Sequence, residues 1–190
     1  MELVLSRCVL RSWHPRDVSS LVRHSNSRQV WRNLRDRFPY PYTAADAERW
    51  TREAPSTIPE THFAITVDAE AVGGAGLELQ QDVHRRPAEI GYWLGEPYWG
   101  RGIATEAVRA LTAFGFRMFD LCRIYACVFE WNPASMRVLE KAGYSLEGRL
   151  RKSVTKDGQT IDQLLYAILR EDAAPSSPCA QTIRDHPSAV

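Results

Sequence analysis

Two glycines lie directly before a predicted helix, at positions 100 and 102. Because Gly100 and Gly102 lack a Cβ atom, the backbone there can adopt positive φ angles and approach a ligand closely. Apolar residues recur at helical spacing over residues 103–119, and the first amide groups of such a helix have no partner within it. These N–H groups and the positive end of the helix dipole suit a phosphate or pyrophosphate. The segment is predicted to be an anion-binding turn, the alternative being a tight turn without a ligand.

A second polar sequence, Asn132-Pro133-Ala134-Ser135, opens another predicted helix. Asn is a favoured N-cap residue, Pro is favoured at the first helical position, and Gly143 is predicted to end the helix. From the residues alone, Asn132 and Ser135 also fit an ordinary helix start without a chemical role.

Two familiar phosphate-binding loops do not fit the glycine turn. A P-loop requires Lys followed by Ser or Thr after its second glycine, whereas this chain has Ile103 and Ala104. A dinucleotide-binding fingerprint requires a third glycine or alanine at the position of Thr105. The turn therefore belongs to a looser pattern, in which a glycine and an alanine begin the helix.

Three stretches of the sequence together closely resemble the GCN5-related N-acetyltransferase (GNAT) superfamily. They are residues 89–94 (E-I-G-Y-W-L), the glycine turn and residues 132–135, and the resemblance extends over residues 3–170. In that superfamily the turn reads Gln/Arg-x-x-Gly-x-Gly/Ala, so Gly102 and Ala104 match, whereas Trp99 replaces the expected Gln or Arg. This departure removes one polar ligand and leaves more of the binding to backbone amides. Within the superfamily, the chain is similar to the branch that includes the ribosomal-protein N-terminal alanine and serine acetyltransferases.

The resemblance implies that acetyl-CoA enters a gap between two separating strands, at residues 89–94 and 121–129. Backbone N–H groups of Trp93 and Leu94 would bond the pantetheine or the thioester oxygen, and residues 99–105 would hold the pyrophosphate. The candidate coenzyme-binding residues are Tyr92, Trp93, Leu94, Trp99, Gly100, Arg101, Gly102, Ile103, Ala104, Thr105 and Asn132.

Acetyl transfer from a thioester to an amine requires an uncharged amine, a donor for the oxyanion and a proton for the leaving thiolate. The resemblance implies that the Ser135 hydroxyl faces the thioester sulfur and acts as the general acid. The candidate general bases are Glu89, on the strand beside the thioester, and Glu78, on the preceding hairpin. Glu89 can instead form an ion pair with Arg85 or Arg86. An α-amine, with a pKa of about 7.7 to 8.0, needs less help from a base than a lysine side chain does.

The acceptor side of the site is predicted from aromatic residues early in the chain. Two prolines force extended geometry on the loop at residues 38–43, and the resemblance implies that this region forms a wall of the acceptor cleft. Trp31, Tyr40 and Tyr42 are the candidate substrate-binding residues. The alternative is that these rings only cover the core.

The elements that position these residues follow from periodicity and turn signals. A strand is expected at residues 3–12, a helix after Asp17, a helix at residues 28–35, and a helix capped by Thr43 and Asp46. The later elements are a hairpin at residues 61–67 and 71–80, a strand at 88–94, a helix at 103–119, a strand at 121–129, a helix after 132, and strands at 144–150 and 161–169. This order predicts an α/β fold with one mixed sheet and helices on its faces.

Length and composition indicate a single domain, assigned to residues 1–172, and a disordered tail is expected at residues 173–190, which are rich in Pro, Ser and Ala. With 24 basic and 23 acidic residues the net charge is +1, so no global field attracts nucleic acid or membrane. No apolar run could span a bilayer, and a cytoplasmic protein without a metal is expected. The four cysteines are expected to be reduced, and the five histidines to be surface or loop residues.

The sequence therefore predicts an acetyl-CoA-dependent N-acetyltransferase that acts by direct transfer, as a monomer or homodimer. The expected acceptor is the N-terminal α-amine of a protein. Two alternatives remain: a small amine such as an amino sugar, polyamine or amino acid as the acceptor, or a non-catalytic acyl-CoA-binding sensor.

Overall fold

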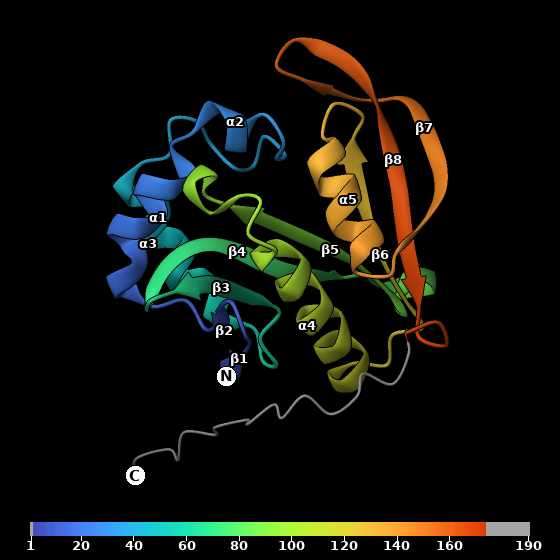
Figure 1. Ribbon diagram of the computed structural model, residues 1–190, viewed down its shortest axis with the longest axis horizontal. Coiled ribbons are helices and arrows are strands. Elements are labelled where there is room, and N and C mark those ends of the chain that lie inside the picture. Colours follow the sequence, from blue (N-terminus) through green and yellow to red (C-terminus); the bar gives the residue numbers. More distant parts are fainter. Residues whose placement is uncertain (1, 174–190) are drawn as a thin grey trace.

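The computed structural model describes residues 2–173 of the 190-residue chain. These residues form a mixed sheet of eight strands with helices on both faces, as expected (Figure 1). The strand order across the sheet is β1-β2-β3-β4-β5-β6-β8-β7. The tail expected at residues 173–190 lies outside the described residues from position 174 onward.

The strands are β1 (Glu2–Val4), β2 (Val9–Arg11), β3 (His62–Val67), β4 (Glu70–Leu79), β5 (Pro87–Leu94), β6 (Arg123–Phe129), β7 (Ser145–Lys156) and β8 (Gln159–Leu169). The α-helices are α1 (Val18–Ser25), α2 (Arg28–Trp31), α3 (Ala44–Glu53), α4 (Ile103–Met118) and α5 (Pro133–Lys141). Four short 3₁₀ turns within the described residues are η1 (Pro15–Asp17), η2 (Ala54–Ser56), η3 (Asp82–His84) and η4 (Glu96–Tyr98).

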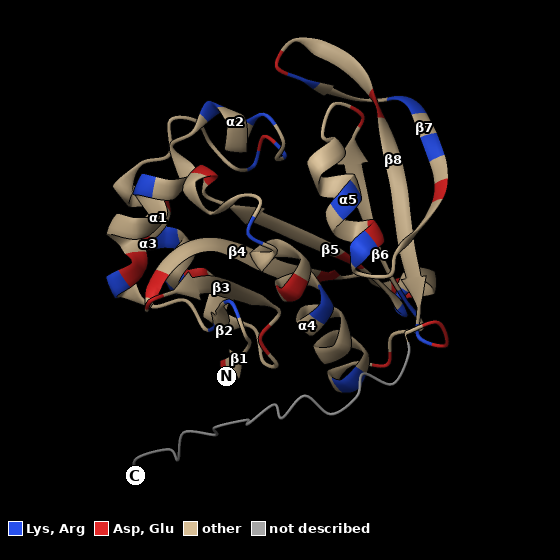
Figure 2. Ribbon diagram, viewed as in Figure 1, with Lys and Arg blue, Asp and Glu red and all other residues tan. Residues whose placement is uncertain are grey.

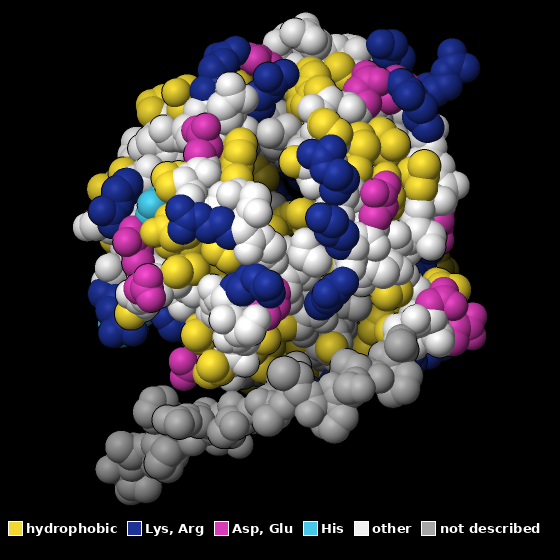
Figure 3. Space-filling model, viewed as in Figure 1, with side chains coloured by type: hydrophobic (Ala, Val, Ile, Leu, Met, Phe, Trp, Pro, Cys, Tyr) yellow, Lys and Arg dark blue, Asp and Glu magenta, His cyan; other side chains and the backbone are white. Residues whose placement is uncertain are grey.

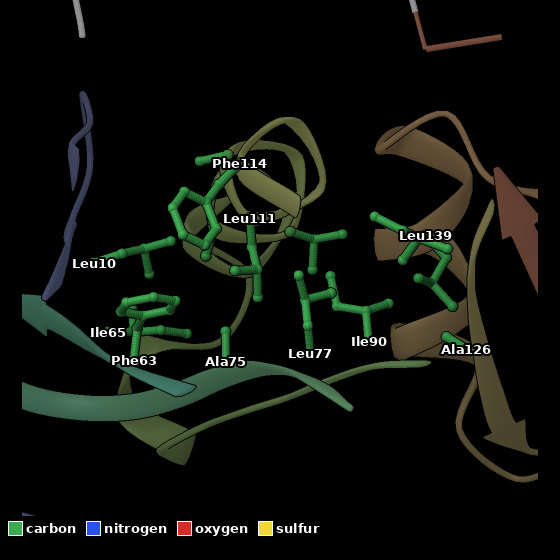
Figure 4. Packing of buried hydrophobic residues seen from close by; sticks show 14 of the residues in the cluster. Leu10, Phe63, Ile65, Ala75, Leu77, Ile90, Leu111, Phe114, Ala126 and Leu139 are labelled. Atoms are coloured by element: carbon green, nitrogen blue, oxygen red, sulfur yellow. The ribbon is translucent and has the colours of Figure 1, made fainter. Parts of the chain in front are cut away.

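The two faces of the sheet carry two separate hydrophobic clusters, because side chains alternate along each strand. Phe63 and Ile65 of β3 join the larger cluster under α4, whereas Ala64 between them joins a smaller cluster with residues of α1 and α3. Figure 4 shows Leu111 and Phe114 of α4 above the first of these faces, where they pack against side chains of β3, β4 and β5. Burial of these large apolar side chains stabilises the central part of the sheet.

The sheet opens between its two central parallel strands. β5 and β6 are paired only at Pro87–Arg123, Ala88–Ile124 and Glu89–Tyr125. Beyond those pairs, β5 remains bonded to β4 as far as Leu94, and β6 remains bonded to β8 as far as Phe129. The two strands therefore separate after Glu89, as the resemblance implied, and peptide groups of both strands border the opening without a partner across it.

Local start and stop signals are confirmed at several elements. Thr43 and Asp46 form a reciprocal capping box at α3, and the Asn132 side chain accepts a hydrogen bond from the Ser135 N–H at the start of α5. Gly143 follows α5 with φ 97°, the left-handed conformation that glycine favours after a helix.

Three predicted boundaries were wrong. The single strand expected at residues 3–12 is instead the hairpin β1–β2, because the Glu106 carboxylate of α4 accepts the N–H groups of Ser6 and Arg7 and fixes a turn there. The helix expected at residues 28–35 ends at Trp31. β7 continues past residue 150 to Lys156, through a shift in its register with β8.

Candidate active site

A cleft of about 840 Å³ follows the opening between β5 and β6. Its lining includes residues from both faces of the sheet: α4 and α5 on one side, and α3 with the loop between α2 and α3 on the other. Figure 3 shows a hollow in this face of the molecule with Lys and Arg side chains around it. The cleft thus brings most of the predicted site residues together.

The glycine turn before α4 has the backbone geometry that its sequence predicts. Gly100 and Gly102 have φ angles of 74° and 77°, and Gly102 is the N-cap residue of α4. Residues 99, 100 and 102–105 all line the cleft, with the unpartnered amide groups of the first helical turn. A turn of this kind can bind the phosphate oxygens of a coenzyme.

The side chains of Trp99 and Arg101, both in this turn, differ in whether they line the cleft. The Trp99 indole Nε1 donates a hydrogen bond to the Leu94 carbonyl oxygen at 2.6 Å, which ties the turn to the end of β5. The guanidinium of Arg101 lies 5.2 Å from the centre of the Tyr98 ring and does not line the cleft. Trp99 therefore supports the turn, whereas Arg101 in this position does not reach into the cleft.

Tyr92, Trp93 and Leu94 lie on β5 beyond the point where β6 separates. All three residues line the cleft, and their peptide groups on the β6 side have no partner in that strand. Since N–H groups alternate in direction along a strand, a subset of them is available to a ligand in the opening. This geometry fits the predicted contact with pantetheine or a thioester oxygen.

Ser135 lies in the first turn of α5, on the same side of the sheet as α4. Its Oγ lies 2.8 Å from the hydroxyl of Tyr92, and either atom can donate. The Tyr92 hydroxyl can instead donate its one proton to the Ser135 carbonyl oxygen at 3.2 Å. Burial raises the pKa of Tyr92 more than its hydrogen bond to Ser135 lowers it, so this phenol stays protonated. When Tyr92 donates to Oγ, the hydrogen of Ser135 is free to turn toward a group in the cleft.

Asn132 has two roles. It caps α5, because its side-chain oxygen accepts a hydrogen bond from the Ser135 N–H at 3.1 Å, and it lines the cleft. We expect Asn132→Ala to weaken coenzyme A binding, measured by calorimetry, and to lower the free energy of unfolding by about 1 kcal/mol through loss of the cap. Thr43→Ala, which removes a comparable cap at α3, is the matched control. It should lower stability with unchanged coenzyme affinity, and equal affinities in the two variants would contradict a role for Asn132 in binding.

The two candidate bases face each other on the opposite side of the sheet. Glu78 of β4 and Glu89 of β5 are register partners, and both line the cleft. Arg35 pairs with Glu89 at 2.5 Å and Arg37 pairs with Glu78 at 2.6 Å. These arginines come from the loop after α2 and offset the repulsion between two carboxylates placed opposite one another.

The charge partners of these carboxylates differ from those suggested by the sequence. The alternative pairing of Glu89 with Arg85 or Arg86 was wrong, since Arg86 pairs with Asp120 at 3.1 Å. Burial raises the pKa of Glu78, but the hydrogen bond and charge of Arg37, together with His62, outweigh burial and hold that pKa below its usual range. Glu78 is therefore a weaker base than an ordinary glutamate, although as an anion it can bind an ammonium group.

Two histidines are not the surface or loop residues that were expected. His62, on β3, lines the cleft, with its Nε2 3.3 Å from Glu78 Oε1 and its Nδ1 2.9 Å from the Thr61 hydroxyl. His24, on α1, is buried and lies 2.6 Å from Glu70. No local pattern in the sequence indicates the pairing of His62 with Glu78 or of His24 with Glu70, because these carboxylates lie far along the chain from the histidines.

Of the three aromatic candidates for acceptor binding, one lines the cleft and two do not. Tyr42 is buried, with 6% of its surface exposed, and lines the cleft beside Phe38. Trp31 and Tyr40 pack against each other, with ring centres 5.6 Å apart, and neither lines the cleft. Trp31 instead packs under the buried ammonium group of Lys156, at 3.7 Å from the ring centre. Only Tyr42 is thus positioned for contact with a bound molecule.

Two basic residues of α5 are part of the candidate site although the sequence patterns above did not point to them. Arg137 and Lys141 both line the cleft. Figure 2 shows basic residues along α5 and in the turn before α4 on the same face of the molecule. The spacing of four residues, which places two side chains on one face of a helix, is the signal that could have identified them. Together with Arg7, whose Nε lies 3.4 Å from the Cβ position of Gly102, they make this end of the cleft suitable for anions.

Metal-binding and membrane-spanning features are not found within residues 2–173. No group of three or more His, Cys, Asp or Glu side chains in this range could hold a metal ion. None of the helices in the same range has the length and apolar character needed to cross a membrane. Cys8, Cys122 and Cys127 are free thiols, and Cys179 lies outside the described residues.

Comparison with known proteins identifies the family. Residues 7–145, more than half of the chain, match the family model described as an acetyltransferase (GNAT) domain. The chain belongs to the GNAT family.

Two curated relatives match part of the chain. The chain is 47% identical over 115 residues to YjcK of Bacillus subtilis, described as a probable N-acetyltransferase, over 60% of this chain and 64% of the relative. It is 32% identical over 111 residues to spermidine N(1)-acetyltransferase of Escherichia coli, over 58% of this chain and 59% of that enzyme. The chain therefore aligns with less than two thirds of the length of either relative.

A solved structure agrees with the fold over most of the chain. It is Mycobacterium smegmatis RimJ in complex with CoA-disulfide, which superposes with a TM-score of 0.77 at 27% identity, over 93% of this chain and 89% of RimJ.

Proposed function

We propose that this GNAT protein transfers the acetyl group of acetyl-CoA directly to a primary amine, and that the preferred acceptor is the N-terminal α-amine of a protein. The observation that carries the proposal is the opening between β5 and β6. It joins an anion-binding turn and the Ser135 hydroxyl on one side of the sheet to Glu89 on the other side. An acyl donor and an amine can thus approach one another from opposite faces.

Acetyl-CoA would supply a thioester, whose C–S bond breaks as the C–N bond to the amine forms. The amides of residues 102–105 would hold its pyrophosphate, and β5 backbone N–H groups in the opening would bond its carbonyl oxygen. Glu89 would take the proton of the incoming ammonium, directly or through a water molecule. Ser135 would donate its hydroxyl proton to the departing sulfur, with Tyr92 hydrogen-bonded to the serine oxygen. The second proton of the attacking nitrogen, lost as the amide forms, would restore the Ser135 hydroxyl directly or through a water molecule.

Arg137 and Lys141 are proposed to bind a further phosphate of the coenzyme, since both line the cleft on α5. We expect coenzyme A to bind the wild-type protein more tightly than dephospho-coenzyme A, which lacks the 3′-phosphate. The Arg137→Ala/Lys141→Ala variant should reduce that difference to less than about twofold, because charge-assisted hydrogen bonds to phosphate are the strong ones. Arg16→Ala, an exposed arginine outside the cleft, is the control. An undiminished preference for coenzyme A in the double variant would contradict the assignment.

One observation favours a polyamine as a second candidate acceptor. Glu78 and Glu89 lie opposite each other within the cleft, and each is balanced by an arginine from a single loop. The ammonium groups of a polyamine could replace those arginines as the hydrogen-bonded partners of both carboxylates. Among small amines, a polyamine is favoured over an amino sugar or an amino acid, because one relative is described as a spermidine N(1)-acetyltransferase.

Release of free thiol from acetyl-CoA, measured with a panel of amines, tests these proposals. The panel contains peptides with free and blocked N-termini, spermidine, an amino sugar and a free amino acid. Faster release with the free peptides supports the proposed function, whereas faster release with spermidine supports the second candidate. Coenzyme binding without thiol release for any amine would leave the third possibility, an acyl-CoA-binding sensor.

A further inference from the structure

Gly91 is an unusual residue for the middle of a sheet. It lies in β5 between Ile90 and Tyr92, yet it is exposed and lines the cleft. A Cβ atom built at this position would meet nothing within 4 Å. Its φ angle is not in the left-handed region, so the backbone there does not require glycine. Glycine inside a strand weakens the strand, and neither packing nor conformation explains it here.

Gly91 lies on the face of the sheet that borders the proposed acceptor side of the cleft. Alternation along β5 places Ile90 and Tyr92 on the face under α4 and α5, and Glu89, Gly91 and Trp93 on the opposite face. β6 separates from β5 immediately before this residue, directly after Glu89. Open space therefore lies over Gly91, beside the opening and between a carboxylate and an indole.

The neighbouring glycine of β4 provides a contrast. Gly76 is the register partner of Gly91, but a Cβ atom at Gly76 would lie 2.3 Å from Cδ2 of His62. Glycine at position 76 is thus required by the packing of this chain itself. At position 91 the space is left empty by the protein, which is expected where a ligand approaches the backbone closely.

We propose that Gly91 determines acceptor specificity, by leaving room for the substituent on the carbon atom that bears the attacking amine. This inference rests on the proposed function, and it deepens it by assigning the first residue of a peptide acceptor to the space between Glu89 and Trp93. A side chain at position 91 would occupy that space, so the largest first residues would be excluded first. The coenzyme side of the opening would be unaffected, because the new side chain projects from the other face.

The test compares wild type, Gly91→Ala and Gly91→Val with peptides that differ only in a first residue of Gly, Ala, Ser or Val. Gly148→Val is the matched control, since Gly148 is also a strand glycine with open space around it but lies outside the cleft. Two quantities are measured: kcat/KM for each peptide, and the affinity of each peptide for the coenzyme A complex by calorimetry.

We expect Gly91→Ala to lower kcat/KM and affinity for the Ala peptide, relative to the Gly peptide, on the order of tenfold, and Gly91→Val on the order of a hundredfold. Coenzyme affinity should be unchanged and Tm equal to or above that of wild type, because both substitutions favour the strand. Gly148→Val should keep the wild-type ratios.

The two measurements separate failure of this inference from failure of the proposed function. Thiol release with wild-type peptide ratios in both Gly91 variants would overturn the role of Gly91 and leave the proposed function intact. Peptide binding that depends on position 91 without any thiol release would support the inference and overturn the proposed function. If peptides neither bind nor react, both are overturned.

Discussion

Ser135→Ala is expected to reduce kcat by about ten- to a thousandfold, at or below the usual range of about 10² to 10⁴ for general acids, with little change in acetyl-CoA affinity. A thiol of pKa about 8.5 leaves poorly as a bare anion in a partly dry cleft, so a hydroxyl directed at the sulfur lowers the barrier as the bond breaks. The loss is limited because a hydroxyl is a weak acid. Affinity is preserved because the backbone amides of the turn before α4 supply most of the binding.

The structure makes this substitution easy to interpret. Alanine leaves the Tyr92 hydroxyl with the carbonyl oxygen of residue 135 at 3.2 Å, so the buried phenol keeps a hydrogen-bond partner. Ser135→Thr, which retains a hydroxyl, should recover part of the activity, and Ser19→Ala on an exposed turn of α1 is the matched control. Rates are measured at saturating acetyl-CoA, after chemistry has been shown to limit turnover. Wild-type kcat in Ser135→Ala under those conditions would exclude the role of proton donor.

Gly102→Val is expected to abolish detectable coenzyme A binding while the protein stays folded. At a φ angle of 77° a residue with a Cβ atom costs about 1–2 kcal/mol, and a β-branched side chain is worse still. The turn should relax away from this conformation and displace the amide groups at the start of α4. The atoms nearest to an added Cβ at this position belong to the flexible side chain of Arg7, so backbone conformation is the main cause.

Gly158→Val provides a control with the same type of backbone strain. Gly158 has a φ angle of 74°, has open space around it, and lies in the turn between β7 and β8, outside the cleft. Both variants should lose stability, but only Gly102→Val should lose coenzyme binding by calorimetry, with folding verified by circular dichroism. Unchanged coenzyme affinity in a folded Gly102→Val protein would contradict the assignment of this turn as the coenzyme-binding site.

Some of the structure could be read from short stretches of sequence, because the signals act within a few residues. The capping box of Thr43 and Asp46, the cap at Asn132 and the two glycines before α4 all have their predicted geometry. In each of these cases a side chain bonds the backbone nearby, or the absence of a Cβ atom permits a conformation. The glycine turn and the start of α5, the core of the coenzyme side, were therefore predictable from the sequence.

Other features depended on contacts between residues far apart in the chain. Arg35 and Arg37 pair with Glu89 and Glu78, which lie 54 and 41 positions away. The expected pairing with Arg85 or Arg86 followed only from nearness in sequence. Ion pairs of this kind are decided by how a loop packs over the sheet, and no local pattern encodes them.

The sequence by itself determined the family, the mixed α/β fold and the turn that could bind a phosphate. Only the tertiary structure decided where β5 and β6 separate, since pairing ends after Glu89 although both strands continue. The tertiary structure also places Trp31 outside the cleft, where it packs against Lys156 of β7, 125 positions away in the chain. It leaves empty space over Gly91, beside the opening between the two strands. The physical reason is that propensity and capping act over one or two turns of chain, whereas a cleft is the space left after distant elements have packed.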